Sequence, residues 1–221
     1  MYKLLTTIVA LAASCMTASS FAQVKGDAKA GETKNAMCIG CHGIKGYQAS
    51  FPEVYKVPMI SGQGAGYITV SLNAYKKGER KHPTMRGIAE ALSDQDIADL
   101  AAFYSADGNT DAAALPAKPS QEPTAAVQAL LGKANCASCH GANYAAPIDP
   151  SYPKIAGQHA DYLFVALKAY KTDSSNLKVG RANAVMGAMA KQYTNAELKA
   201  MAGYLASVQG DLKVVPQSRF R

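Results

Sequence analysis

The sequence lacks several features that would indicate other classes of protein. It contains no tryptophan, and it shows no run of alternating apolar and polar residues of the kind that forms β-strands. Beyond residue 22, no stretch is long and apolar enough to cross a bilayer, which takes about 20 residues. Basic and aromatic residues do not form the array that binds nucleic acid. The 221 residues, of which 48% are hydrophobic, are instead typical of one large or two small globular domains.

The N-terminal segment 1–22 is typical of a secretory signal peptide. It has one early lysine, an apolar run over residues 4–13 and small residues before an expected cleavage site after Ala22. The alternatives are an uncleaved anchor and lipid attachment at Cys15, although a lipidation signal usually has a bulky aliphatic residue where Ala12 stands. We therefore expect an exported protein.

Two copies of a short cysteine motif follow, "MCIGCHG" at 37–43 and "NCASCHG" at 135–141. They contain Cys38, Cys41 and His42, then Cys136, Cys139 and His140. Cysteines at i and i+3 project from the same side of a helical turn, where their sulfurs can form thioethers with the two vinyl groups of a haem. The adjacent histidine can then bind the iron, and this motif is typical of c-type haem attachment. The two motifs predict two covalently attached haem c groups.

Three other uses of these cysteines are alternatives. A thioredoxin-like dithiol requires a βαβ context, which the sequence lacks. A zinc site could combine the four cysteines and both histidines, but zinc motifs usually hold their ligands close together and need no adjacent histidine. A disulfide within each pair leaves the histidine unexplained.

The cysteine motifs belong to a tandem duplication. Three segments align in the same order in both halves: 58–76 with 153–171, 80–85 with 181–186, and 92–104 with 193–205. The stretch 107–126 has three prolines and no apolar period, so it is expected to be a linker. The expected organisation is a signal peptide (1–22), a first domain (23–106), the linker (107–126) and a second domain (127–221).

Both halves are expected to be all-α. Ser93 and Thr194 are candidate N-caps, with Asp96 and Glu197 three residues later as capping-box partners. Apolar residues then recur at helical spacing after each cap. Further helices are expected over 29–37, 66–76, 125–134 and 161–171.

Methionine is the expected second iron ligand in each half. Met85 and Met186 both stand eight positions before a helix cap and five after an arginine, and a thioether favours the reduced iron. Met189 competes for the second iron because it lies one helical turn from Met186. The remaining histidines, His82 and His159, have no counterpart in the other copy and are expected to be surface or loop residues.

Two arginines and four tyrosines are shared by the repeat: Arg80, Arg181, Tyr67, Tyr75, Tyr162 and Tyr170. A guanidinium group binds carboxylates in a bidentate fork, so the arginines could pair with haem propionates. The alternative for the arginines is solvated loop positions. The tyrosines are expected to pack against the haem ring or the domain seam, with one or two hydrogen bonds to a propionate.

Together, the signal peptide, the duplicated "CxxCHG", "PxIxGQ", "AYK" and "RxxxxM" motifs and the final "LSDQDIADLAAFY" resemble the dihaem cytochrome c4 family. The resemblance covers the whole chain after residue 22. It implies two cytochrome c domains related by a pseudo-twofold axis, with neighbouring haems. By motif position it implies haem attachment and ligation by Cys38, Cys41, His42 and Met85, then Cys136, Cys139, His140 and Met186. The longer loop 172–185 of the second copy departs from the repeat.

The resemblance also implies a periplasmic electron carrier, loosely associated with the inner membrane. Its expected donor is a quinol–cytochrome c reductase and its expected acceptor a haem–copper oxidase. With both irons closed by His and Met, no substrate position remains, so no enzyme activity is expected. The alternative is a dihaem subunit of an oxidoreductase such as a flavocytochrome sulfide dehydrogenase.

Charge differs between the two halves. Residues 23–115 hold 10 basic and 10 acidic side chains, whereas residues 116–221 hold 12 and 6. The second half is therefore expected to dock an acidic redox partner.

Overall fold

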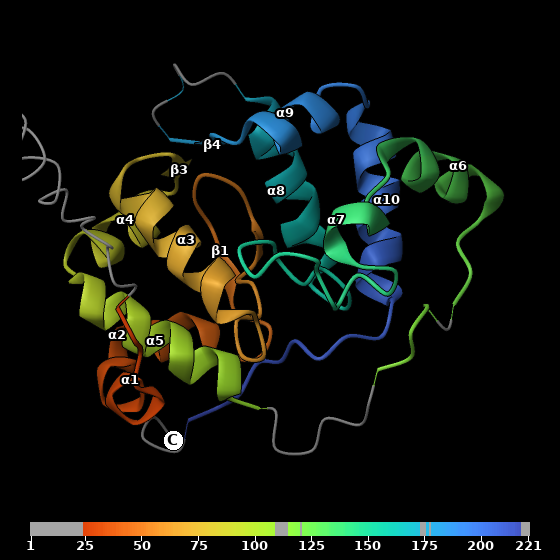
Figure 1. The fold of residues 1–221 in the computed structure, drawn as a ribbon. Coiled ribbons are helices and arrows are strands. Elements are labelled where there is room, and N and C mark those ends of the chain that lie inside the picture. Colours follow the sequence, from red (N-terminus) through yellow and green to blue (C-terminus); the bar gives the residue numbers. More distant parts are fainter. Residues whose placement is uncertain (1–23, 109–114, 120, 173–175, 177, 218–221) are drawn as a thin grey trace, which may run out of the picture.

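The computed structural model describes residues 24–108, 115–119, 121–172, 176 and 178–217. The expected signal peptide and part of the expected linker lie outside these residues. The described chain forms two groups of helices that lie against each other (Figure 1), and no helix in it is long and apolar enough to span a membrane.

The helices follow the same order in the two halves, and the first half has an additional pair of short strands. The first half contains α1 (Ala28–Lys34), α2 (Ala36–His42), β1 (Gln48–Ala49), β2 (Tyr55–Lys56), α3 (Ala65–Lys76), β3 (Arg80–Lys81), α4 (Pro83–Glu90) and α5 (Asp94–Ala106). The second half contains α6 (Ala125–Ala134), α7 (Ala137–His140), α8 (Ala160–Lys171), β4 (Gly180–Arg181), α9 (Ala184–Ala190) and α10 (Asn195–Ser207). The all-α prediction is confirmed, with only four two-residue strands among the described residues.

The last helix of each half starts at a capping box. The Ser93 side chain accepts a hydrogen bond from the backbone of Asp96, whose carboxylate accepts in return from the Ser93 backbone. Thr194 and Glu197 form the same pair at α10. The predicted boxes are therefore confirmed, and they fix the starts of α5 and α10.

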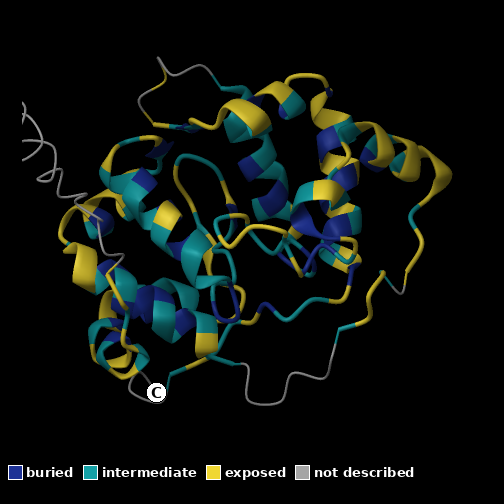
Figure 2. Cartoon of the chain, viewed as in Figure 1, coloured by how far each residue is buried: buried dark blue, intermediate teal, exposed yellow. Residues whose placement is uncertain are grey.

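In the first half, α1 and α5 cross closely at a glycine. A Cβ at Gly31 would lie 2.1 Å from the carbonyl oxygen of Asp99 and 2.7 Å from Phe103 Cβ. The buried side of α5 then packs on α3 through Ile68, Leu100 and adjacent residues. This side of α5 is dark blue in Figure 2.

In the second half, α6 packs on α10 through larger side chains. Leu131 lies in a core cluster with Tyr193, Leu198 and Met201. A Cβ at Gly132 would meet nothing within 4 Å, so no close backbone crossing forms at this glycine. A second cluster, on α8 and α10, carries the loop that follows the cysteine motif.

The two halves join through pseudo-symmetric contacts. Strand β3 pairs antiparallel with β4, so that Arg80 lies opposite Arg181. Gln63 binds the backbone of Lys154 in the other half, and Gln158 binds the backbone of Met59 in return. These exchanges relate the halves by an approximate twofold axis.

Further contacts at the junction differ between the halves. The Lys56 backbone and ammonium both donate to Asp161 at the start of α8, and Lys168 pairs with Glu53 at 2.5 Å. At the position equivalent to Asp161, Gly66 of α3 packs directly on the backbone of Pro150. The β1–β2 hairpin of the first half therefore lies on α8 of the second.

The C-terminal tail returns to the first half, where it meets the start of the linker. The Lys213 backbone N–H donates to the carbonyl oxygen of Ser61 at 3.0 Å, and its ammonium donates to the carbonyl oxygen of Gly108 at 2.6 Å. The hydroxyl of the same Ser61 donates to Asp107 at 2.6 Å. Ser61 is buried and binds both the start of the linker and the C-terminal tail. The sequence did not predict this contact.

Candidate functional site

The two cysteine motifs lie on equivalent helical turns. Cys38 and Cys41 are three residues apart on α2, and Cys136 and Cys139 take the corresponding places around α7. No disulfide joins these four cysteines. Burial raises the pKa of Cys38 and Cys136 to about 11, so both remain uncharged at neutral pH. A thioether sulfur is also uncharged and suits the same apolar surroundings.

A proline carbonyl holds each motif histidine. His42 Nδ1 lies 2.8 Å from the oxygen of Pro58, and His140 Nδ1 lies 2.9 Å from that of Pro153. A carbonyl can only accept, so Nδ1 carries the proton in both rings and Nε2 keeps its lone pair. Burial lowers the pKa of both imidazoles and keeps them neutral. This is the state in which histidine binds a metal, with its second nitrogen oriented by a carbonyl.

The expected methionine ligands lie in equivalent places on α4 and α9. The N-cap of α4 is His82, whose Nδ1 accepts from the Met85 backbone at 3.4 Å. The N-cap of α9 is Asn183, whose side-chain oxygen accepts from the Met186 backbone at 2.9 Å. Met189 instead packs against the core cluster between α6 and α10. The caps therefore make Met186, rather than Met189, the counterpart of Met85.

The two remaining histidines differ from each other. His82, expected to be a surface or loop residue, lies between β3 and α4, where its ring caps α4, and it is partly buried at the edge of a cavity between the halves. His159 precedes α8 and makes no capping bond through its side chain. The structure therefore gives His82 a local role that its absence from the other copy did not suggest.

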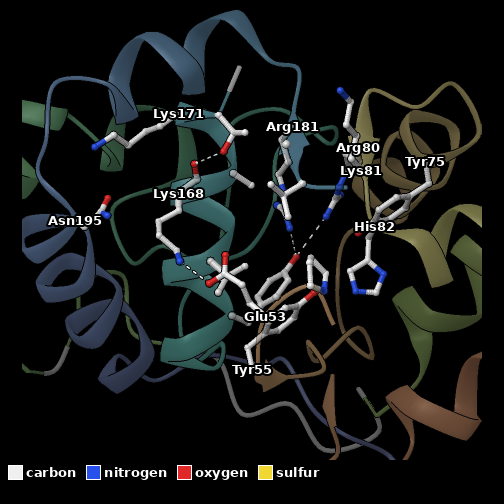
Figure 3. Close-up of a pocket in the computed structure, with 17 residues that line it drawn as sticks. Glu53, Tyr55, Tyr75, Arg80, Lys81, His82, Lys168, Lys171, Arg181 and Asn195 are labelled. Carbon is white, nitrogen blue, oxygen red and sulfur yellow. Dashed lines mark hydrogen bonds and ion pairs between the residues drawn. The ribbon is translucent and has the colours of Figure 1, made fainter. Parts of the chain in front are cut away.

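The cavity between the halves has a volume of 290 Å³, and Figure 3 shows Arg80 and Arg181 approaching it from β3 and β4. Arg80 donates to the hydroxyls of Tyr67 at 3.3 Å, Ser71 at 2.5 Å and Tyr162 at 3.4 Å. Arg181 donates to the same Tyr162 hydroxyl at 3.0 Å. The arginines are therefore held at the seam, and the alternative of solvated loop positions is wrong.

The positive charges of Arg80 and Arg181 are not balanced by carboxylates of the described residues. Arg80 lies over the ring of Tyr75 and Arg181 over that of Tyr170, but no carboxylate among the described residues pairs with either guanidinium. The Nε of Arg80 is buried without a partner. Burial alone would raise the pKa of Tyr162, but the two guanidinium groups lower it to about 8. Haem carboxylates would supply the missing charge, so these residues fit the group.

The alternatives for the cysteines find no support in the geometry. Within the described ranges, no three cysteine, histidine or acidic side chains come together as a metal site. The described strands form two-residue antiparallel pairs, so the βαβ unit of a thioredoxin-like dithiol is absent there.

The cytochrome c family model matches the chain twice, at residues 28–105 and 124–209. Cytochrome c4 of Azotobacter vinelandii is 31% identical over 198 residues, which cover 85% of this chain and 91% of the relative. The chain belongs to the dihaem cytochrome c4 family. The crystal structure of reduced recombinant cytochrome c4 from Pseudomonas stutzeri aligns with a TM-score of 0.58 at 26% identity, over 83% of this chain and all of that one.

This cytochrome is an electron-transfer protein with two covalently bound haem c groups, and its fold of two tandem cytochrome c domains is confirmed. A thiosulfate dehydrogenase electron acceptor of Stutzerimonas stutzeri is 32% identical over 176 residues, which cover 77% of this chain and 78% of the relative. The domain boundaries and the ligand residues remain predictions.

Sequence reasoning missed two features of the site. The carbonyls of Pro58 and Pro153 orient the histidines, and Gln63 and Gln158 bind across the halves. Their signal was present, because "PxIxGQ" is among the best-matched parts of the repeat. The role of the two prolines could not be predicted, because any residue type can supply a backbone carbonyl.

Proposed function

We propose that this cytochrome carries electrons in a periplasmic respiratory chain, from a quinol–cytochrome c reductase to a haem–copper oxidase. In this proposal Cys38 and Cys41 attach one haem, and Cys136 and Cys139 attach the other. Each iron is closed by a histidine and a methionine: His42 with Met85, and His140 with Met186. Export after Ala22 and loose association with the inner membrane belong to the same proposal.

The observation that carries the ligand assignment is the pair of histidine–proline hydrogen bonds. Each leaves Nε2 as a free lone pair on a neutral, oriented ring, and each lies directly beside a cysteine motif. When bound, the haem supplies one-electron chemistry between ferric and ferrous iron. The chain orients the ligands, excludes water and offers hydrogen bonds to the carboxylates.

Absorption spectra of single-ligand variants test this assignment. Met85→Ala and Met186→Ala should each remove about half of the ferric charge-transfer band near the red edge, and each should let the reduced protein bind carbon monoxide. Met189→Leu is the matched control and should keep the whole band. If Met189→Leu loses the band and Met186→Ala keeps it, the assignment of the second methionine is wrong.

The excess positive charge of the second half supports docking of an acidic partner. Lys133, Lys178, Lys191 and Lys199 are exposed and form no salt bridge with the described residues. Surface charge of one sign steers association and makes its rate depend on salt. The rate of oxidation by membranes that contain the oxidase should therefore fall as ionic strength rises. A rate that does not change with salt would contradict this part of the proposal.

A second candidate is delivery of electrons from a thiosulfate dehydrogenase. The similarity to a thiosulfate dehydrogenase electron acceptor favours it. Stopped-flow reduction by purified thiosulfate dehydrogenase and by quinol–cytochrome c reductase separates the two routes, because the physiological donor should be faster by orders of magnitude. The mass of the protein recovered from the periplasm tests both export and the presence of two haems.

A further inference from the structure

The glutamines that cross the seam bind the same peptide groups that hold the histidines. Pro58 supplies the carbonyl oxygen to which His42 donates, and the N–H of that same peptide belongs to Met59. This N–H donates to Gln158 Oε1 at 3.0 Å. The chain of hydrogen bonds therefore runs from the histidine of the first half, through one peptide, to a side chain of the second half.

The other half repeats the arrangement in the opposite direction. His140 donates to the oxygen of Pro153, and the N–H of that peptide, which belongs to Lys154, donates to Gln63 Oε1 at 2.9 Å. Both glutamines are buried, at 4% and 3% exposure for Gln63 and Gln158. Solvent therefore does not compete for the hydrogen bonds of these two side chains.

The geometry fixes which end of each amide faces the peptide. Gln158 Oε1 also accepts from the backbone of His159 at 3.0 Å, while its Nε2 donates to the carbonyl oxygen of Met59 at 2.9 Å. Gln63 makes the same three bonds, with Gly64 and Lys154. A flipped amide would set its NH₂ group against two N–H donors, so only one orientation satisfies all the bonds.

We propose that each half tunes the reduction potential of the other half's iron through this relay, with Gln158 acting on the His42 side and Gln63 on the His140 side. The proposal rests on the histidine ligation stated above. Both glutamines are positioning residues, because they act on the iron only through a peptide and a histidine.

The direction of the effect follows from polarisation of the peptide. A peptide whose N–H is bonded carries more negative charge on its oxygen, and hydrogen bonds in such chains strengthen one another. A stronger acceptor at Nδ1–H makes the imidazole a more basic ligand. A more basic ligand favours ferric iron, so the glutamine lowers the potential. Its loss should raise the potential of the haem in the opposite half.

The experiment compares Gln158→Leu and Gln63→Leu in the full-length protein with both haems attached. Spectroelectrochemical titration should show one raised potential in each variant, and a different one in each. The expected change in the ferric-to-ferrous ratio is several-fold, up to about tenfold, which corresponds to about 59 mV for one electron. Gln192→Leu is the control, because the side chain of this exposed glutamine donates to the carbonyl of Ala188 in its own half and lies outside the relay.

NMR of the reduced protein assigns each shift to a histidine. The Nδ1–H resonance of His42 should move in Gln158→Leu, and that of His140 in Gln63→Leu. If both potentials move together in either variant, or if neither moves, the relay is refuted and the glutamines only join the halves. If a leucine variant does not mature, Gln158→Met or Gln63→Met keeps the length and volume of the side chain.

Failure of the relay is distinguishable from failure of the ligand assignment. The charge-transfer band of the unaltered protein and of the methionine variants decides the ligands, whatever the glutamine variants do. The crossed pattern of potentials decides the relay alone.

Discussion

Gly66 provides a sharp test of how tightly the two halves are joined. A Cβ at this position would lie 2.5 Å from the carbonyl oxygen of Pro150 in the other half, 2.9 Å from its carbonyl carbon and 3.1 Å from its Cβ. Ordinary contact begins at 3.4 Å, so Gly66→Ala must open the seam locally by about 0.9 Å. Gly64→Ala is the matched control, because its Cβ would lie 3.7 Å from the same oxygen.

The expected cost at the seam is about 1–3 kcal/mol, the usual range for an overpacked contact. Gly66 is in the first turn of α3, where alanine is favoured over glycine by about 1 kcal/mol. That gain acts on the first half whether the halves are paired or apart, so it does not offset the clash. The two effects can therefore be separated by measuring pairing and unfolding independently.

Hydrogen exchange measures the pairing. The backbone N–H groups of Met59 and Lys154 donate to glutamines across the seam, so they exchange when the halves part. Gly66→Ala should speed their exchange about 5- to 150-fold, which corresponds to 1–3 kcal/mol. Gly64→Ala should leave it within about twofold of the unaltered protein. Equal exchange in both variants would refute the packing argument.

Three further predictions concern single residues. Gly31→Ala places a Cβ 2.1 Å from the α5 backbone and should lower the free energy of unfolding by about 3 kcal/mol, whereas Gly132→Ala meets nothing and should raise it by about 0.5–1 kcal/mol; urea denaturation measures both. His82→Ala removes the cap of α4 at a cost of about 1 kcal/mol, so the charge-transfer band should fade at a lower temperature, while His82→Asn, the cap used by the other half, should preserve it. The hydrogen bond from Lys34 holds the pKa of Asp99 below its usual range, so its contribution to stability is full above the unfolded carboxyl pKa, about 4, and is lost as pH falls. Asp99→Asn should therefore flatten the loss of stability below about pH 5. An unchanged pH profile of the free energy of unfolding would contradict the assignment.

The parts of the fold that could be predicted depend on short-range pattern. The capping boxes at Ser93 and Thr194 are local, because the side chain and the N–H that it binds are three residues apart. The predicted helix over 125–134 matches α6 from end to end. The helix expected over 29–37 is instead broken at Asn35, which is buried where α1 ends and α2 begins.

The parts that could not be predicted depend on contacts between backbone atoms far apart in the chain. The pairing of β3 with β4 involves two residues on each side, too few to leave a pattern of alternation. The short helices α4 and α9 also gave little signal, since a helix of seven or eight residues shows at most two turns of periodicity. The candidate ligands were found because they combine rare residue types with fixed spacing.

The buried Ser61, which holds both Asp107 and Lys213, makes the second half a closed loop with both ends fastened at one point. To exchange halves, two copies of this protein would have to release the bonds of Lys213 to Ser61 and Gly108, which opposes domain swapping. Halves that briefly separate meet again within the same molecule, at the millimolar effective concentration typical of a short tether. The rate of electron transfer between the two haems is therefore independent of the protein concentration.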